Sequence, residues 1–177
     1  MKDESDILAE GDHLLLIDSK DRRYLLTLES GKQFHSHSGY VAHDEVIGSR
    51  SGITVKSTGG LEYLALRPTM ADVILKMPRS AQIIYPKDIG PIIIAADIAP
   101  SHRILESGVG SGALSIALLR SGANVTGIEL REDFAQRARK NVETFYGIES
   151  INDRYNVLMG NAYEGLEGSG YDRIVLD

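Results

Sequence analysis

Arg103-Ile104-Leu105-Glu106-Ser107-Gly108-Val109-Gly110-Ser111-Gly112-Ala113-Leu114 is the stretch that decides the fold of this chain. An apolar strand ends in an acidic residue, and a glycine-rich turn then opens a helix. Gly108, Gly110 and Gly112 occupy alternate positions, so the backbone can turn sharply and approach a ligand without an intervening Cβ atom. The unpaired N–H groups at the start of the helix point toward the same place. The stretch therefore predicts a strand–turn–helix unit that binds a small ligand.

The residues after this unit continue the alternation of strand and helix. Apolar runs at 124–129, 155–159 and 171–177 predict three more strands, and a helical pattern of apolar residues begins after Arg131. This order is typical of half a doubly wound parallel sheet, so we expect an α/β, Rossmann-like fold. Since such a sheet needs further strands and covering helices, we expect the sequence to be truncated after the fourth strand.

The first part of the chain has a different pattern. Short runs with strand propensity, separated by turn residues, follow one another from residue 11 to residue 66 and predict a small N-terminal β-barrel-like domain at 1–66. Arg67-Pro68-Thr69 marks the boundary to a second domain at 67–177. In it, Thr69 and Asp72 predict the start of a helix that Pro78 closes. Residues 83–88 should be extended because a residue before proline avoids the α region, and the apolar run 89–98 fits a helix or a strand.

The composition excludes several kinds of site. The 177 residues include no cysteine, which rules out disulfides and thiolate metal sites. His35, His37 and His43 lack the further ligands that zinc needs, so we expect no metal. A charged N-terminus and the absence of a long apolar run predict a cytoplasmic protein with no membrane partner. The net charge of −6 argues against indiscriminate binding of polyanions, but it is compatible with a nucleic acid held by a local basic patch.

Two classes of ligand fit the glycine turn. Gly108-x-Gly110-x-x-Ala113 matches the dinucleotide-binding fingerprint, which leaves an NAD-dependent oxidoreductase as an alternative function. Glu106-x-Gly108-x-Gly110-x-Gly112 resembles motif I of the class I S-adenosylmethionine (AdoMet) methyltransferases. Glu106 favours AdoMet, because a carboxylate attracts a sulfonium and an ammonium but gains nothing beside a pyrophosphate. Glu129 follows the turn at about the 20-residue spacing of an acid that binds ribose hydroxyls.

Further stretches narrow the resemblance to one family. The sequence also contains Arg67-Pro68-Thr69, Tyr85-Pro86-Lys87-Asp88, Glu129-Leu130-Arg131, the stretch 135–141 and Val175-Leu176-Asp177. Near the N-terminus it contains Phe34-His35-Ser36-His37-Ser38-Gly39 with His43-Asp44, and Ser57-Thr58-Gly59-Gly60-Leu61-Glu62-Tyr63. Together with the glycine turn, they resemble the tRNA (adenine-58-N1)-methyltransferases from residue 11 onward.

The resemblance implies a role for each residue of the site. The expected AdoMet-binding residues are Glu106, Gly108, Gly110, Ser111, Gly112, Ala113, Leu114, Glu129, Phe134, Asn161, Ala162 and Asp177. Residues 108–114 would wrap the methionine part, Glu129 would hold the ribose hydroxyls, and Asn161-Ala162 would flank the adenine. Asp177 matches the catalytic aspartate of the family, and Tyr85 matches a tyrosine that lines the pocket for the target base.

The resemblance implies methyl transfer from AdoMet to N1 of adenine 58 in the T-loop of tRNA, with adenine 57 left open, by a homo-oligomer that the family suggests is a tetramer. The product base is cationic. A carboxylate that accepts a hydrogen bond from the N6 amino group therefore stabilises the transition state more than the ground state. The target adenine must leave its stack, and Tyr85 could then pack on it. A non-catalytic tRNA-binding paralogue, or a methyltransferase for a protein or small molecule, remains an alternative.

Overall fold

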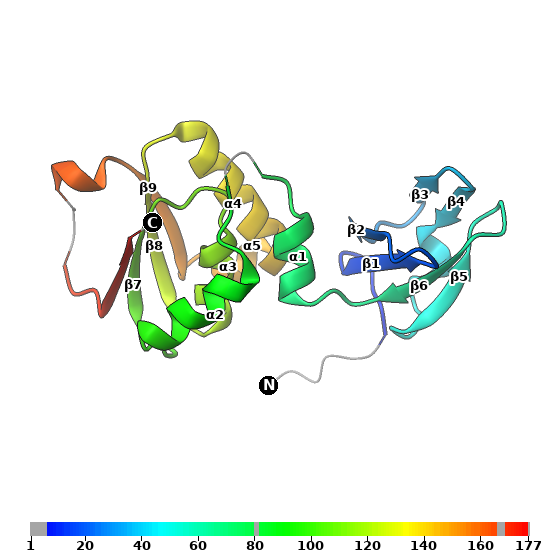
Figure 1. Cartoon of the computed structure of the whole chain (residues 1–177), viewed down its shortest axis with the longest axis horizontal. Coiled ribbons are helices and arrows are strands. Elements are labelled where there is room, and N and C mark those ends of the chain that lie inside the picture. Colours follow the sequence, from blue (N-terminus) through cyan, green and yellow to red (C-terminus); the bar gives the residue numbers. More distant parts are fainter. Residues whose placement is uncertain (1–6, 80–81, 166–168, 177) are drawn as a thin grey trace. The chain divides into compact units, whose positions relative to one another are not determined.

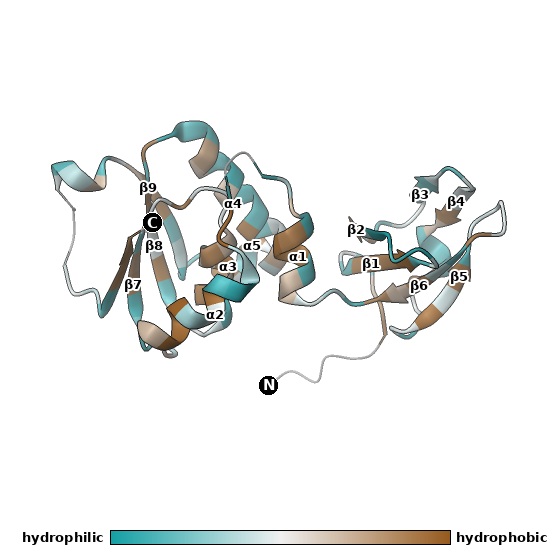
Figure 2. Ribbon diagram, in the orientation of Figure 1, coloured by the Kyte–Doolittle hydropathy of each residue, from teal (hydrophilic) through white to brown (hydrophobic). Residues whose placement is uncertain are grey.

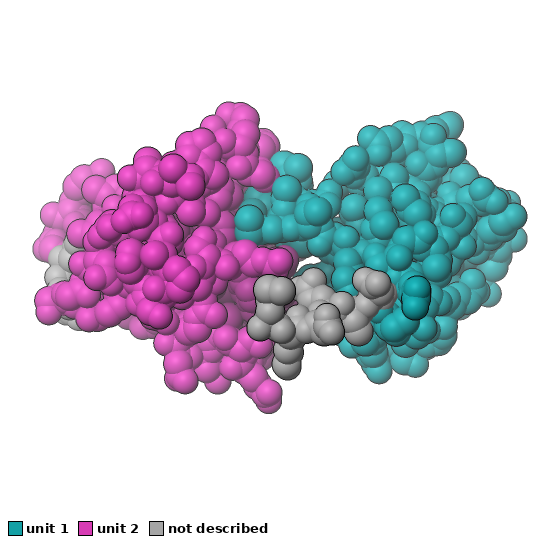
Figure 3. Space-filling view, turned by 90° about the horizontal axis from the view of Figure 1, so that it is seen from below, with its two compact units in different colours: residues 1–76 teal, residues 77–177 magenta. Residues whose placement is uncertain are grey.

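A computed structural model describes residues 7–79, 82–165 and 169–176 of the chain (Figure 1). The contacts within it divide the chain into two compact units, residues 1–76 and residues 77–177 (Figure 3). Helix α1 (Met70–Lys76) packs against strand β2 (Arg23–Thr27) and belongs to the first unit. The domain boundary predicted between residues 66 and 67 lies just before this helix and stays a prediction.

The N-terminal unit is a small β domain. Strands β1 (His13–Asp18), β2, β5 (Ile53–Lys56) and β6 (Glu62–Leu66) form an antiparallel sheet in the order β2-β1-β6-β5. Strands β3 (Gln33–Ser36) and β4 (Gly39–Ala42) form a hairpin, and a 3-10 turn, η1 (His43–Glu45), follows it. Residues of the sheet and of the segment around the hairpin share one hydrophobic core, in which Tyr63 is fully buried. The small β domain is confirmed, but its described strands form an open sheet and a hairpin and do not close into one barrel.

The helix predictions for residues 69–98 are confirmed in part. Thr69 caps α1, because its Oγ1 accepts a hydrogen bond from the N–H of Asp72 at 3.2 Å and its own N–H donates to the Asp72 carboxylate at 3.0 Å. Helix α2 (Pro86–Ala95) begins earlier than expected, so the prediction that residues 83–88 are all extended is wrong for 86–88. Tyr85 itself is extended, with ψ of 153°. Pro86 can start the helix because the first helical position needs no N–H.

The second unit contains the predicted parallel sheet. Strands β7 (Arg103–Ser107), β8 (Asn124–Glu129), β9 (Tyr155–Met159) and β10 (Arg173–Leu176) pair in parallel in the order β10-β7-β8-β9. The chain moves outward from β7 through β8 to β9 and then returns to the other side of β7 with β10. The strand order therefore reverses at β7, and in open α/β sheets ligands bind at the carboxyl ends of the strands at such a point.

The helices of this unit follow from the hydrophobic pattern. Helix α3 (Ala113–Arg120) joins β7 to β8, and helices α4 (Glu132–Tyr146) and α5 (Ile148–Ile151) join β8 to β9. A 3-10 turn, η2 (Ala162–Glu164), follows β9. In Figure 1, α2, α3 and α4 lie on the same side of the sheet. Helix α3 is buried along nearly its whole length between its neighbours, whereas α4 alternates buried and hydrophilic positions (Figure 2). This packing fixes the glycine turn between β7 and α3.

Candidate functional site

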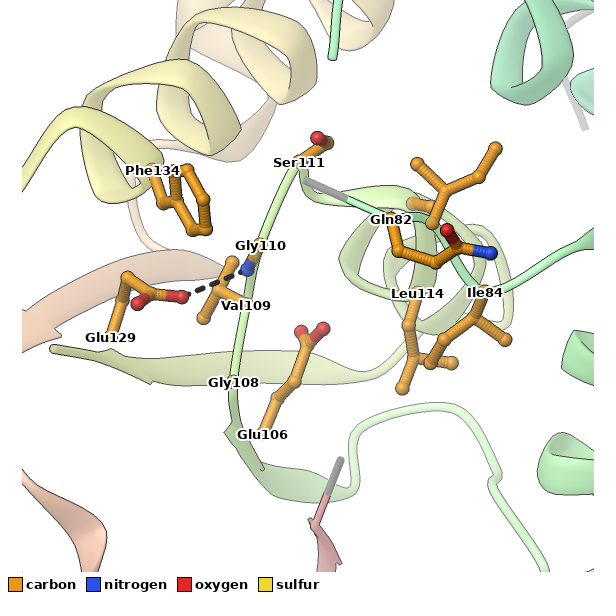
Figure 4. Close-up of a pocket in the computed structure, with 12 residues that line it drawn as sticks. Gln82, Ile84, Glu106, Gly108, Val109, Gly110, Ser111, Leu114, Glu129 and Phe134 are labelled. Atoms are coloured by element: carbon orange, nitrogen blue, oxygen red, sulfur yellow. Dashed lines mark hydrogen bonds between the residues drawn. The ribbon is translucent and has the colours of Figure 1, made fainter. Parts of the chain in front are cut away.

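A pocket of about 240 Å³ lies where β7 and β8 end (Figure 4). It combines two buried carboxylates with backbone from the glycine turn and apolar walls. Its lining includes eight of the residues predicted from the sequence, which are Glu106, Gly108, Gly110, Ser111, Ala113, Leu114, Glu129 and Phe134. Val109 completes the turn, and Gln82, Ile83 and Ile84 form the opposite wall. The structure thus brings most of the predicted ligand-binding residues together.

The glycine turn adopts a backbone that other residues rarely adopt. Gly108, Gly110 and Gly112 have φ of +83°, +58° and +82°, in the left-handed region where glycine has no Cβ penalty. The N–H of Gly108 donates to the carbonyl of Ile128 at 2.9 Å, which ties the turn to the end of β8. The backbone conformation therefore favours glycine at all three positions. Two of these glycines, Gly108 and Gly110, also line the pocket.

Gly112 packs against helix α4. It does not line the pocket, and a Cβ atom placed on it would lie 3.2 Å from the carbonyl oxygen of Ala138 and 3.3 Å from a methyl of Val142, both on α4. Gly112 therefore lets α4 pack closely behind the turn. Its predicted contact with AdoMet stays a prediction.

Asn141 is a site residue that the sequence reasoning missed. Its buried side-chain Nδ2 donates to the carbonyl of Ser111 at 2.9 Å and to the carbonyl of Pro78 at 2.7 Å. One amide thereby connects α4, the glycine turn and the segment that leads to the wall at Gln82. Its sequence signal was its place in the stretch 135–141, one of those that carry the family resemblance, as a polar residue beside Val142.

Glu129 faces the turn from the end of β8. Its Oε2 accepts a hydrogen bond from the N–H of Gly110 at 3.0 Å (Figure 4). Its Oε1 accepts one from the N–H of Arg131 at 3.0 Å. Only 7% of the residue is exposed, and the two N–H groups offset the loss of water around the carboxylate. A ligand hydroxyl at this site would share the carboxylate with Gly110.

Glu106 lies on the other side of the turn, and only 2% of it is exposed (Figure 4). Its Oε2 accepts a hydrogen bond of 2.6 Å from Ser115 Oγ, in the first turn of α3. Two carboxylates therefore flank a turn whose backbone approaches closely. Such a pocket attracts a ligand with cationic and hydroxyl groups and repels a pyrophosphate, which argues against the dinucleotide alternative.

Three other predicted residues in the described part of the chain lie outside the pocket lining. Tyr85 follows Ile84 directly, forms the N-cap of α2 and is 38% exposed. Asn161 uses its side chain to accept a hydrogen bond from the N–H of Tyr163 at 3.1 Å, which caps η2, and Ala162 begins that turn. Asp177 lies outside the described residues. The roles of these residues stay predictions.

Phe134 lines the pocket, and the guanidinium of Arg131 lies 3.8 Å from the centroid of its ring. This cation–π contact restrains the ring at the first turn of α4, next to Glu129. The wall formed by Gln82, Ile83 and Ile84 was not predicted. Its signal was its position immediately before Tyr85-Pro86, a stretch that the family resemblance had already singled out.

Two of the three histidines considered as metal ligands, His43 and His35, contact neighbouring residues of the N-terminal unit. His43 is buried, and its Nδ1 accepts a hydrogen bond from the N–H of Glu29 at 3.0 Å. The ring of His35 contacts that of Tyr40. Among residues 7–79, 82–165 and 169–176, no group of three or more His, Cys, Asp or Glu side chains is arranged to hold a metal ion. In the same described part, no helix has the length and apolar character needed to cross a membrane.

Comparisons with known proteins agree with this geometry. Residues 7–55 match a family model described as TrmI-like N-terminal, and residues 62–159, more than half of the chain, match the model for the tRNA methyltransferase complex GCD14 subunit. The tRNA (adenine(58)-N(1))-methyltransferase TrmI of Thermus thermophilus is 36% identical over 168 residues. That alignment covers 93% of this chain and 64% of the relative, so the chain spans less than two thirds of the relative's length.

Solved structures show the same similarity. A SAM-dependent O-methyltransferase from Thermotoga maritima superposes with a TM-score of 0.86 and 31% identity, over 99% of this chain and 65% of that one. The tRNA (m1A58) methyltransferase TrmI of Aquifex aeolicus superposes with a TM-score of 0.74 and 27% identity, over 93% of this chain and 63% of that one. With the glycine turn and its flanking carboxylates in place, the chain belongs to the tRNA methyltransferase complex GCD14 subunit family and carries a TrmI-like N-terminal domain.

Proposed function

We propose that this protein transfers a methyl group from AdoMet to N1 of adenine 58 in the T-loop of tRNA. The observation that carries the proposal is the pair of buried carboxylates, Glu106 and Glu129, on either side of the glycine turn. AdoMet has a sulfonium, an ammonium and a ribose diol, and these groups match a carboxylate-flanked pocket. The names of the Thermus and Aquifex relatives support the choice of adenine 58.

Different residues of the pocket would contact different parts of AdoMet. Glu129 would accept hydrogen bonds from the ribose hydroxyls beside its bond to Gly110, while Glu106 would face the methionine part. Phe134 and the wall at Ile83 and Ile84 would exclude water from the nucleoside. When bound, AdoMet supplies an electrophilic methyl group, and the pocket contributes orientation, which accounts for much of the acceleration of such a displacement.

The target base would be held by residues whose roles rest on the family resemblance. Asp177 would accept a hydrogen bond from the N6 amino group and stabilise the positive charge that grows on the ring in the transition state. Tyr85 would stack on the adenine once it has left the T-loop. N1 of adenine already has a free lone pair, so the reaction needs no base to remove a proton from it.

A direct assay tests the function. The full-length protein is incubated with unmodified tRNA and AdoMet labelled at its methyl group, and the tRNA is digested to nucleosides. We expect labelled 1-methyladenosine, and mapping of the label should place it at position 58 alone or at positions 57 and 58. Label in a 2′-O-methylated nucleoside, or transfer to proteins or small molecules but not to tRNA, would contradict the proposal.

The same proposal includes an assembly and a location. By family resemblance, we propose a homo-oligomer, with four copies, in the cytoplasm. Light scattering of the full-length protein measures the number of copies, and a monomer would contradict the assembly.

A further inference from the structure

Three side chains behind the pocket are connected by hydrogen bonds. They are Tyr155 on strand β9, Ser115 on helix α3 and Glu106 on strand β7. The hydroxyl of Tyr155 lies 3.3 Å from Ser115 Oγ, and Ser115 Oγ lies 2.6 Å from Glu106 Oε2. Ser115 is fully buried, and Tyr155 is partly buried. Since these residues come from three different elements, the sheet and helix must pack correctly before these two hydrogen bonds can form.

The direction of the two hydrogen bonds follows from the protons that are available. The Glu106 carboxylate only accepts hydrogen bonds, so Ser115 donates its single proton to it. Ser115 Oγ can then accept the proton of Tyr155. Burial, and after it the negative charge of Glu106, raises the pKa of Tyr155, which keeps the phenol protonated as a donor. Tyr155 therefore donates to Ser115, and Ser115 donates to Glu106.

Holding Glu106 in place matters because its side chain has several rotatable bonds and carries a buried charge. An ionised side chain that has lost its water needs a hydrogen bond, and the 2.6 Å contact has the short length typical of charge-assisted bonds. Ser115 sits in the first turn of α3, where a serine can instead bond to the backbone of its own helix. Here its hydroxyl is directed to the neighbouring strand.

We propose that Ser115 is a positioning residue that holds the Glu106 carboxylate toward the pocket and thereby sets the preference for ligands that carry an α-ammonium group. This inference rests on the proposed function, because it takes AdoMet as the ligand of the pocket. It goes beyond that function in naming the group outside the pocket lining that orients the acidic side chain. Tyr155 supports Ser115 in turn.

The test compares three ligands. AdoMet and S-adenosylhomocysteine carry the amino acid portion, whereas 5′-deoxy-5′-methylthioadenosine has the same nucleoside without it. Binding to the full-length protein is measured by isothermal titration calorimetry for the parent and for Ser115→Ala, Tyr155→Phe and Ser121→Ala. Ser121 is a matched control, because it lies at the other end of α3 and its hydroxyl donates to the carbonyl of Ala117.

Ser115→Ala should weaken AdoMet and S-adenosylhomocysteine by about tenfold or more, as expected for the loss of a hydrogen bond to a charged group. The affinity for methylthioadenosine should not change. Tyr155→Phe should give a smaller loss with the same selectivity, and Ser121→Ala should bind all three ligands like the parent. Unchanged binding of methylthioadenosine also shows that the Ser115→Ala variant is folded.

Two results would overturn the inference while the proposed function stands. One is parent-like affinity of Ser115→Ala for AdoMet, and the other is an equal loss for all three ligands, which would indicate a purely structural role. If the parent itself binds no AdoMet, the proposed function fails and the inference fails with it. The parent titration therefore separates the two cases.

Discussion

Replacing Gly112 with alanine tests how closely the glycine turn must pack against helix α4. The added Cβ would lie 3.2 Å from the Ala138 carbonyl oxygen, 3.3 Å from the Ala138 Cα and 3.3 Å from a Val142 methyl, while the backbone has φ of +82°. A left-handed backbone costs an L-residue about 1–2 kcal/mol. Crowding in a packed interior costs about 1–3 kcal/mol more. We therefore expect Gly112→Ala to lower the free energy of unfolding by about 2–5 kcal/mol.

Gly147 provides a control without crowding. It has a φ of +78°, but nothing lies within 4 Å of the position where its Cβ would be. Its ψ of 141° differs from the 16° of Gly112, so it lies outside the left-handed helical region, and Gly147→Ala has a backbone penalty of its own of about 1–3 kcal/mol. This variant shows what a positive φ alone does to stability and binding when α4 is not crowded.

Thermal and urea unfolding are followed by circular dichroism at a wavelength that reports helix, since α3 and α4 both belong to the second unit. Calorimetric titration then measures the affinity of the pocket for AdoMet. Gly112→Ala should bind more weakly because the turn must move away from α4, whereas Gly147→Ala should bind like the parent. A loss of only about 1–2 kcal/mol in Gly112→Ala, which is the backbone penalty alone, would refute the assigned packing role of Gly112.

Four other predictions concern separate parts of the second unit. Glu129→Gln keeps the shape but removes the charge, so AdoMet should bind about tenfold more weakly by titration; unchanged affinity would contradict its role. Gly127→Ala would place a Cβ 2.5 Å from a Val109 methyl and should lower the melting temperature, and Val109→Ala should restore it in the double variant; no recovery would exclude this contact. Burial raises the pKa of Tyr146 to about 12, above its ordinary value of 10.0, so its contribution to stability is complete below pH 10 and is lost as pH rises through about 12. Stability of Tyr146→Phe should fall less over this range in urea unfolding, and identical pH profiles would contradict the assignment. Asp177→Ala should still bind AdoMet but lose about a hundredfold in methyl transfer to tRNA; parent-like turnover would remove Asp177 from the mechanism.

The sequence by itself determined the elements and their order. The alternation of apolar runs predicted the parallel strands and helices of the second unit, and Thr69 with Asp72 predicted the start of α1. The glycine turn and the two acidic residues predicted the pocket. These predictions succeed because strand and helix periodicity, caps and glycine turns depend on residues that are close together in the chain.

Only the tertiary structure decided what each residue of the site contacts. It showed that Gly112 faces α4, that Asn141 connects Ser111 to Pro78, and that Ser115 donates a hydrogen bond to Glu106. It also showed that Pro86 begins a helix. Asn141 lies 30 residues from Ser111 and 63 residues from Pro78 in the sequence, so no local pattern connects them. Such contacts arise when the packed sheet and helices bring distant residues within hydrogen-bond distance, and the sequence pattern alone does not give those distances.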